Sequence, residues 1–143
     1  MKSKVLTTSM LLFVAAVAAG PSHAQQISKI NIPFAFQAGS KTLPAGEYRV
    51  MRALQDSSVA QLIQSTDGKT TVVVLTDGVI PKNLDITPKM VFHRYGHEYF
   101  LSQIWTGAGR GRQLSTSKRE KEVMRGLNES EVAILFEPEP LRP

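Results

Sequence analysis

The stretch of sequence that decides the fold runs from Val59 to Leu75 and reads VAQLIQSTDGKTTVVVL. Two apolar segments flank Asp67-Gly68, and an Asp-Gly pair suits a two-residue type I′ hairpin turn because both central residues need positive φ. This turn would set Ile63 opposite Val72. Both faces of residues 71–75 are apolar, which predicts a central strand that is covered on each side.

A second hairpin is predicted downstream, over Lys89 to Thr106 (KMVFHRYGHEYFLSQIWT). Gly96-His97 divides it into two apolar segments, and Gly in the first position of a two-residue loop is typical of a type II′ turn. The register of this loop places His93 opposite Phe100. We therefore interpret His93 as an interior or interfacial histidine packed on Phe100.

Three further segments complete the expected strands and their connections. Ile27 to Phe36 alternates apolar residues with a period of two, but Pro33 lies inside it and predicts an edge strand or a bulge. Residues 76–88 contain Asp77-Gly78 and two prolines, which predicts a loop that crosses between sheets. Val132 to Phe136 shows no alternation and is predicted to be a buried strand.

One short helix is expected near the C-terminus. Ser117 and Glu120 form an S-x-x-E capping box, and Gly126 ends the helical segment that they begin. Turn residues punctuate the rest of the chain at intervals of about eight to twelve residues. The sequence thus predicts an all-β fold, an antiparallel β-sandwich of about seven or eight strands with one short C-terminal helix. A small β-barrel is the alternative.

The first 24 residues have the pattern of a secretory signal peptide. Lys2 and Lys4 precede an apolar run from Met10 to Ala19, which is half the length of about 20 residues that a membrane span requires. Ser22 and Ala24 are small residues at the two positions that a signal peptidase inspects, and we expect cleavage after Ala24. We expect residues 25–137 to form a single β-rich domain and residues 138–143 a flexible tail, in a periplasmic or secreted protein with no membrane span after cleavage.

Composition and motifs give little support for an enzyme. The chain has 143 residues and no Cys, which excludes thiol catalysis, disulfides and Cys-ligated metal. His93 and His97 are four residues apart, a spacing that brings ligands together on a helix and not across a hairpin. No serine stands in a nucleophile-elbow motif. We therefore expect no catalytic residue, no metal and no cofactor.

Basic side chains concentrate between residues 110 and 125. This segment holds six basic residues, which are Arg110, Arg112, Lys118, Arg119, Lys121 and Arg125. A basic patch of this kind suits an anion, and here an anionic envelope component or a polysaccharide is the partner that export would favour. Export argues against nucleic acid. A solvated helix face is the alternative interpretation.

Aromatic side chains concentrate in the second hairpin. The two-residue-loop register places Phe92, Tyr99 and Trp105 on one face, where they would either pack in the core or offer a platform to a sugar. Trp105, at the end of its strand, is the candidate for a partly exposed contact, together with Tyr99.

The blocks LPAGEY (43–48) and FHRYG (92–96) followed by YFLSQIW (99–105), and then the basic SKREKE (117–122), resemble a family of small exported acidobacterial proteins. The resemblance implies export and a β-rich fold, and it transfers no catalytic, ligand or metal residue. The sequence as a whole predicts an exported non-enzymatic module with a binding or structural role. A hydrolase that acts on envelope carbohydrate is the alternative. The sequence does not decide the ligand or the oligomeric state.

Overall fold

The computed structural model describes residues 27–83, 87–107 and 111–138. The predicted signal segment therefore lies outside the described residues, as do Arg110 and residues 139–143 of the predicted tail. The elements of the described part are β1 (Ser28–Ile32), β2 (Phe36–Ala38), β3 (Lys41–Leu43), β4 (Gly46–Leu54), β5 (Ser57–Ser65), β6 (Thr71–Val79), β7 (Lys89–Tyr95), β8 (Glu98–Trp105), β9 (Gly111–Leu114), α1 (Lys118–Met124) and β10 (Glu129–Leu135).

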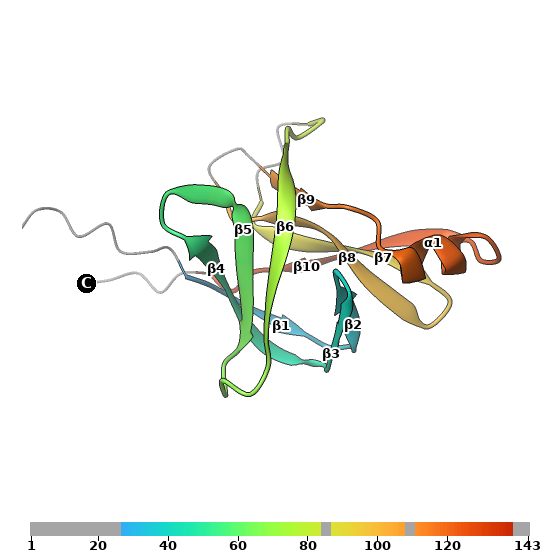
Figure 1. Ribbon diagram of the computed structural model, residues 1–143, viewed down its shortest axis with the longest axis horizontal. Coiled ribbons are helices and arrows are strands. Elements are labelled where there is room, and N and C mark those ends of the chain that lie inside the picture. Colours follow the sequence, from blue (N-terminus) through green and yellow to red (C-terminus); the bar gives the residue numbers. More distant parts are fainter. Residues whose placement is uncertain (1–26, 84–86, 108–110, 139–143) are drawn as a thin grey trace, which may run out of the picture.

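The strands form two sheets that share β6. The hydrogen-bonded path runs β1-β4-β5-β6-β9-β8, and β7 and β10 continue from β8. Figure 1 shows β4, β5 and β6 on one side and β7, β8 and β10 on the other, with α1 beside the end of the β7–β8 hairpin. Neighbouring strands are antiparallel except β2 and β8, which are parallel. The prediction of an all-β fold with one short helix is confirmed.

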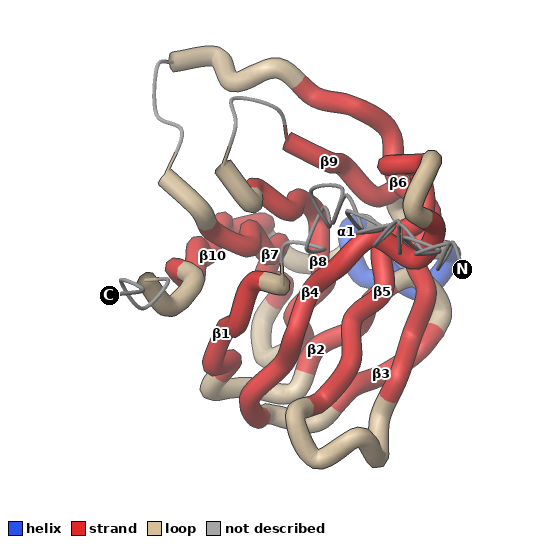
Figure 2. Tube along the Cα trace, turned by 90° about the vertical axis from the view of Figure 1, so that its left-hand side faces the viewer, coloured by secondary structure: helices blue, strands red, loops and turns tan. Residues whose placement is uncertain are grey.

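The two ends of this path approach each other. The backbone N–H of Glu137, just after β10, donates to the carbonyl oxygen of Lys29 in β1 at 2.9 Å. Figure 2 shows β1 beside β4 and close to β10. Two sheets thus pack on one core, as in the predicted sandwich. The sheets are also joined through β6, and β1 contacts β10, so the strands follow one another around the core as they would in the alternative, a small barrel.

The β6 strand is longer than predicted. Residues 71–75 pair with β5, and Thr76 to Val79 continue as strand and pair with β9. The prediction of a loop from residue 76 is therefore wrong over its first four residues, and Asp77-Gly78 is not a turn. The reason is the distant β9, which supplies hydrogen bonds that a local pattern does not anticipate. Gly78 also leaves room for Arg112, whose guanidinium would lie 3.4 Å from a Cβ there.

The β5–β6 hairpin has the predicted register but a different turn. Ile63 pairs with Val72. The N–H of Gly68 donates to the carbonyl oxygen of Ser65 at 2.9 Å, so the reverse turn closes one residue earlier than a type I′ turn on Asp67-Gly68 would. The prediction that this strand is covered on both faces is wrong, because Val74 is buried while Leu75 is 71% exposed.

The β7–β8 hairpin has the predicted two-residue loop at Gly96-His97, and His93 pairs with Phe100. A β-bulge then shifts the register: Val91 pairs with Gln103 and Phe92 with Leu101, so Ser102 is the extra residue. A bulge moves every following side chain to the other face. Ile104 therefore joins Phe92 in the core and Trp105 does not, and the prediction that Trp105 shares a face with Tyr99 is wrong.

The edges of the fold also differ from the sequence pattern. Pro33 separates β1 from β2, and β1 is an edge strand of its sheet, as predicted. The final strand begins at Glu129 and pairs only with β7. The prediction that it is buried without alternation is wrong. Val132 and Ile134 are half-buried while Ala133 and Leu135 are exposed, because an edge strand packs on one face only.

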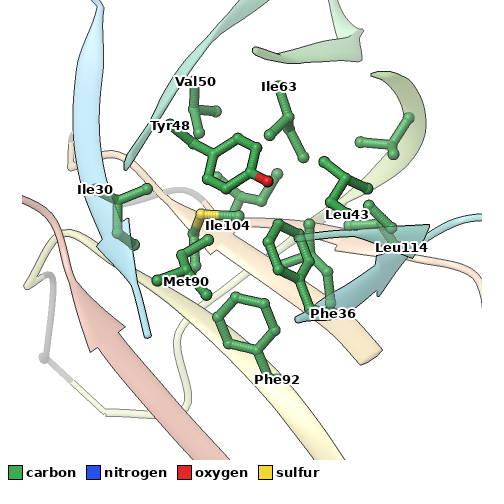
Figure 3. Close-up of a cluster of buried hydrophobic side chains, with 14 of the residues drawn as sticks. Ile30, Phe36, Leu43, Tyr48, Val50, Ile63, Met90, Phe92, Ile104 and Leu114 are labelled. Atoms are coloured by element: carbon green, nitrogen blue, oxygen red, sulfur yellow. The ribbon is translucent and has the colours of Figure 1, made fainter. Parts of the chain in front are cut away.

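The main core lies between the two sheets (Figure 3). Aromatic rings from both sheets meet edge to face, Phe36 against Tyr48 and Phe36 against Phe92, with centroids 5.4 and 5.3 Å apart. Such pairs bury large areas and favour one packing geometry. A second small cluster of Tyr95, Phe100 and Val123 lies under α1, away from the main core.

Candidate functional site

The helix α1 begins where the capping pattern predicts. Ser117 is the N-cap residue, and its Oγ accepts a hydrogen bond from the backbone N–H of Glu120 at 3.1 Å. The carboxylate of Glu120 takes no part in the cap and turns inward. Glu120 and Val123 are the buried residues of the helix, and their three-residue spacing places them on one inward face.

Three of the predicted basic residues share the opposite face of α1. Lys118, Lys121 and Arg125 are three and four residues apart, so their side chains lie along one side of the helix. All three are exposed. Within the described part of the chain, no acidic side chain pairs with any of them. We call these three residues the cationic face.

Arg119 is engaged with acids instead. Its Nε and Nη2 donate to Oε1 of Glu98 at 3.1 and 3.0 Å, and its Nη1 lies 3.7 Å from Oε2 of Glu122. The Glu98 contact ties α1 to the β7–β8 hairpin. Arg119 therefore belongs to the attachment of the helix and contributes little net charge to a ligand surface.

Arg112 is engaged with the sheet. Its Nε donates to Oγ1 of Thr76 at 2.9 Å, and its Nη2 donates to the carbonyl oxygen of Thr76 at 2.7 Å. The side chain is half-buried between β6 and β9. Of the six predicted anion-binding residues, three lie together on the cationic face. Arg112 and Arg119 instead contact other groups of the protein, and Arg110 lies outside the described residues.

A polar cluster lies beneath α1, and the sequence did not predict it. Oε1 of Glu120, a residue that is only 5% exposed, lies 2.8 Å from Nδ1 of His93. Nε2 of the same ring lies 3.7 Å from Oε1 of Glu129 in β10. The hydroxyl of Tyr95 is 3.3 Å from Oε1 of Glu120 and 3.0 Å from Oε2 of Glu129. We call these four residues the His93 cluster.

The His93 cluster keeps the hydroxyl of Tyr95 protonated. Burial raises the pKa of Tyr95 far above its ordinary value, and the hydrogen bond to Glu129 and the charge of Glu120 raise it further. A protonated hydroxyl is the only form that can donate to a carboxylate. Tyr95 therefore acts as a fixed hydrogen-bond donor between α1 and β10.

The two aromatic residues that were predicted to contact a ligand, Trp105 and Tyr99, are instead largely used in packing within the protein. Trp105 is 8% exposed, so it is buried rather than partly exposed as predicted, and its indole N–H donates to Oε1 of Gln103 at 3.0 Å. Tyr99 stacks on Phe34 with a centroid distance of 3.7 Å and an interplanar angle of 11°. The guanidinium carbon of Arg94 lies 5.6 Å from the centre of the Tyr99 ring.

A surface pocket of about 450 Å³ lies beside the cationic face, and Lys121 belongs to both. The other lining residues are Asp77, Gln113, Leu114, Ser115 and Thr116. Its walls thus offer an amide, two hydroxyls, a carboxylate and an ammonium group. These groups can donate and accept hydrogen bonds with a polyhydroxylated ligand.

Comparison of the chain with protein-family models, with curated proteins and with solved structures gives no match. Within residues 27–83, 87–107 and 111–138, no three His, Cys, Asp or Glu side chains are grouped so that they could hold a metal ion. No helix in that same part of the chain is long and apolar enough to cross a membrane. The geometry of α1 and its surroundings is therefore the basis for a functional proposal.

Proposed function

We propose that this protein is an exported, non-enzymatic β-rich module that binds an anionic polysaccharide of the cell envelope or its surroundings through the cationic face. The observation that carries the proposal is the exposure of Lys118, Lys121 and Arg125 on one side of α1. Acids or carbonyl groups engage the neighbouring Arg119 and Arg112. The three free cations thus form one charged strip.

The geometry of the strip favours a polymer over a small anion. Seven residues separate Lys118 from Arg125, which corresponds to about 10 Å along a helix. A linear chain that carries repeated negative charges can contact all three side chains at once. Each contact releases counterions, so binding would weaken as salt increases.

The surroundings of the strip favour a polysaccharide over a lipid surface. Met124 and Leu127 are the exposed large apolar side chains in and just after α1, and two such residues are too few for firm insertion into lipid. The pocket that Lys121 lines offers hydrogen-bonding groups suited to sugar hydroxyls. Its carboxylate, Asp77, would accept hydrogen bonds from sugar hydroxyls.

The test is binding to heparin at low and at moderate salt, with two variants that remove equal charge. Lys118→Ala/Lys121→Ala removes two cations of the strip. Lys69→Ala/Lys82→Ala removes two exposed lysines elsewhere and is the matched control. We expect the first variant to weaken binding about tenfold or more and to flatten the salt dependence, while the control changes little.

Three outcomes would contradict the proposal. Equal loss of heparin binding in both variants would show that net charge, and not the strip, determines affinity. Binding to vesicles of anionic lipid in the absence of heparin binding would identify a lipid surface as the partner instead. Absence of binding to either probe would leave the cationic face as a solvated helix surface.

One observation favours the second candidate, a hydrolase acting on envelope carbohydrate. The His93–Glu120 pair has the arrangement of a base held by an orienting carboxylate, and the His93 side chain is 25% exposed. Turnover of a glycoside or ester substrate that is lost in His93→Gln would establish this function and overturn the first. The same panel of substrates with His97→Gln controls for general effects of removing a histidine.

A further inference from the structure

Few interactions attach α1 to the sheet. Val123 packs against Tyr95 and Phe100, and Arg119 pairs with Glu98 at the hairpin end. The buried carboxylate of Glu120 is a third attachment, because it contacts His93 and Tyr95. The position of the cationic face thus depends strongly on the His93 cluster.

Carboxylates from two different elements approach His93. Glu120 approaches Nδ1 from α1, and Glu129 approaches Nε2 from β10. Glu131, also in β10, is the register partner of His93 and shares its side of the sheet. On β8 the register partner is the apolar Phe100, and the nearby acid Glu98 is paired with Arg119.

The protonation state of this ring decides how many carboxylates it can bind. A neutral imidazole has one N–H, so it can donate to Glu120 through Nδ1 while the lone pair on Nε2 faces the carboxylate of Glu129. An imidazolium has two N–H groups and a positive charge, so it donates toward both carboxylates. The hydrogen bond to Glu120 has an ionised acceptor in either state, and protonation of the ring adds the attraction between two opposite charges to it.

We infer that His93 is a proton-operated lock that ties α1 to the paired strands β7 and β10, through Glu120 on the helix and Glu129 on β10, and thereby fixes the cationic face for its ligand. The effect on ligand binding rests on the proposed function, but the lock itself does not. Acidification locks the helix, and a return to neutral pH loosens it. Polyanion binding is therefore strongest in mildly acidic surroundings.

Hydrogen exchange tests the lock without any ligand. The chain is compared at about pH 5.5 and about pH 7.5, which lie on either side of the ordinary titration range of imidazole and above that of carboxyl groups. After correction for intrinsic exchange rates, we expect the protection of residues 118–125 to be about fivefold greater at the lower pH, because the positive charge on the ring adds an ion-pair attraction to its hydrogen bond with the Glu120 carboxylate. His93→Gln can still donate to Glu120 and cannot titrate, so it should lose this difference.

His97→Gln is the matched control, because it removes a histidine at an exposed position of the hairpin loop, outside the His93 cluster. Glu129→Gln is a second test of the lock that leaves His93 in place, and it should reduce the pH difference. Protection of α1 that is independent of pH, or a pH difference that persists in His93→Gln, would overturn the lock. Loss of the pH difference in His97→Gln would assign the pH dependence to His97, and it would also overturn the lock.

Heparin affinity at the same two pH values and constant salt separates the lock from the proposed function. We expect the wild type and His97→Gln to bind more tightly at the lower pH, by the factor by which the locked fraction increases and by no more than about fivefold, and His93→Gln to lose this gain. An equal pH effect in all three proteins would show that total charge controls binding and would overturn the coupling. Failure of all three proteins to bind heparin would refute the proposed function. The hydrogen-exchange data would still show whether the lock exists.

Discussion

Glu120 and His93 are 27 positions apart in the chain, and their side chains meet at 2.8 Å beneath α1. The helix that carries Glu120 is only seven residues long, and a helix of this length is marginal by itself. Tertiary contacts must therefore supply its stability. The buried carboxylate does so by joining α1 to β7, and Tyr95 extends the connection to β10.

Removal of this carboxylate should destabilise the protein. Glu120→Ala leaves the hydroxyl of Tyr95 and Nδ1 of His93 without their shared acceptor, which costs about 1–3 kcal/mol of the free energy of unfolding. The measurement is urea denaturation at pH 7. Glu122→Ala is the control, because Glu122 lies on the same helix and is exposed, and surface substitutions change stability by less than about 0.5 kcal/mol. Equal effects of the two substitutions would contradict the role of Glu120.

Gly111 should not tolerate a side chain. A Cβ at this position would lie 2.7 Å from three ring carbons of Trp105, which is closer than real contacts allow. Gly111→Ala should therefore displace the indole ring and lower the free energy of unfolding by about 1–3 kcal/mol. Trp105 is the single Trp of the chain, so its fluorescence reports the displacement directly. Gly126→Ala, which meets no atom within 4 Å, should leave both measurements nearly unchanged.

The N-cap of α1 should contribute measurably to stability. Ser117→Ala removes the oxygen that accepts from the N–H of Glu120, and such a substitution costs about 1 kcal/mol. Thermal unfolding measures the loss, and exchange of the amides in residues 118–121 should accelerate. Ser115→Ala removes a hydroxyl two residues earlier, outside the cap, and should affect neither. An unchanged melting temperature in Ser117→Ala would mean that the cap is dispensable.

Alkaline pH should weaken the fold through Tyr95. Its pKa is raised above the ordinary value of about 10, so the folded state holds the phenol proton more firmly than the unfolded state does. This stabilisation is fully present below pH 10 and is lost as the pH rises above it. Burial also raises the pKa of Tyr48, so Tyr95→Phe should reduce but not abolish the loss of stability at high pH.

Tyr99→Phe controls for the removal of a phenol at a half-buried position that is stacked on Phe34. It should leave the alkaline loss of stability unchanged. Chemical denaturation at pH 8 and at about pH 10.5 gives the comparison. Identical pH dependence in wild type and Tyr95→Phe would show that the Tyr95 proton is not linked to folding.

Much of the local structure was determined by the sequence. The pairing of Ile63 with Val72 and of His93 with Phe100 follows from short loops, because a loop of fixed length sets the register of its two strands. The start of α1 at Ser117 follows from one hydroxyl that satisfies a free N–H of the first turn. These are interactions between residues close in the chain, so a local pattern is enough to predict them.

Contacts between distant segments decided the rest. The bulge at Ser102 turns Trp105 away from Tyr99, and β9 extends β6 through Asp77-Gly78. The S-x-x-E pattern identified Glu120 as a capping residue, and only the packing of α1 on β7 showed that its carboxylate meets His93. The sequence by itself determined the strand register next to each short loop and the start of the helix. Tertiary structure decided which charges are free, because a side chain's partner depends on segments that the fold brings together from far along the chain.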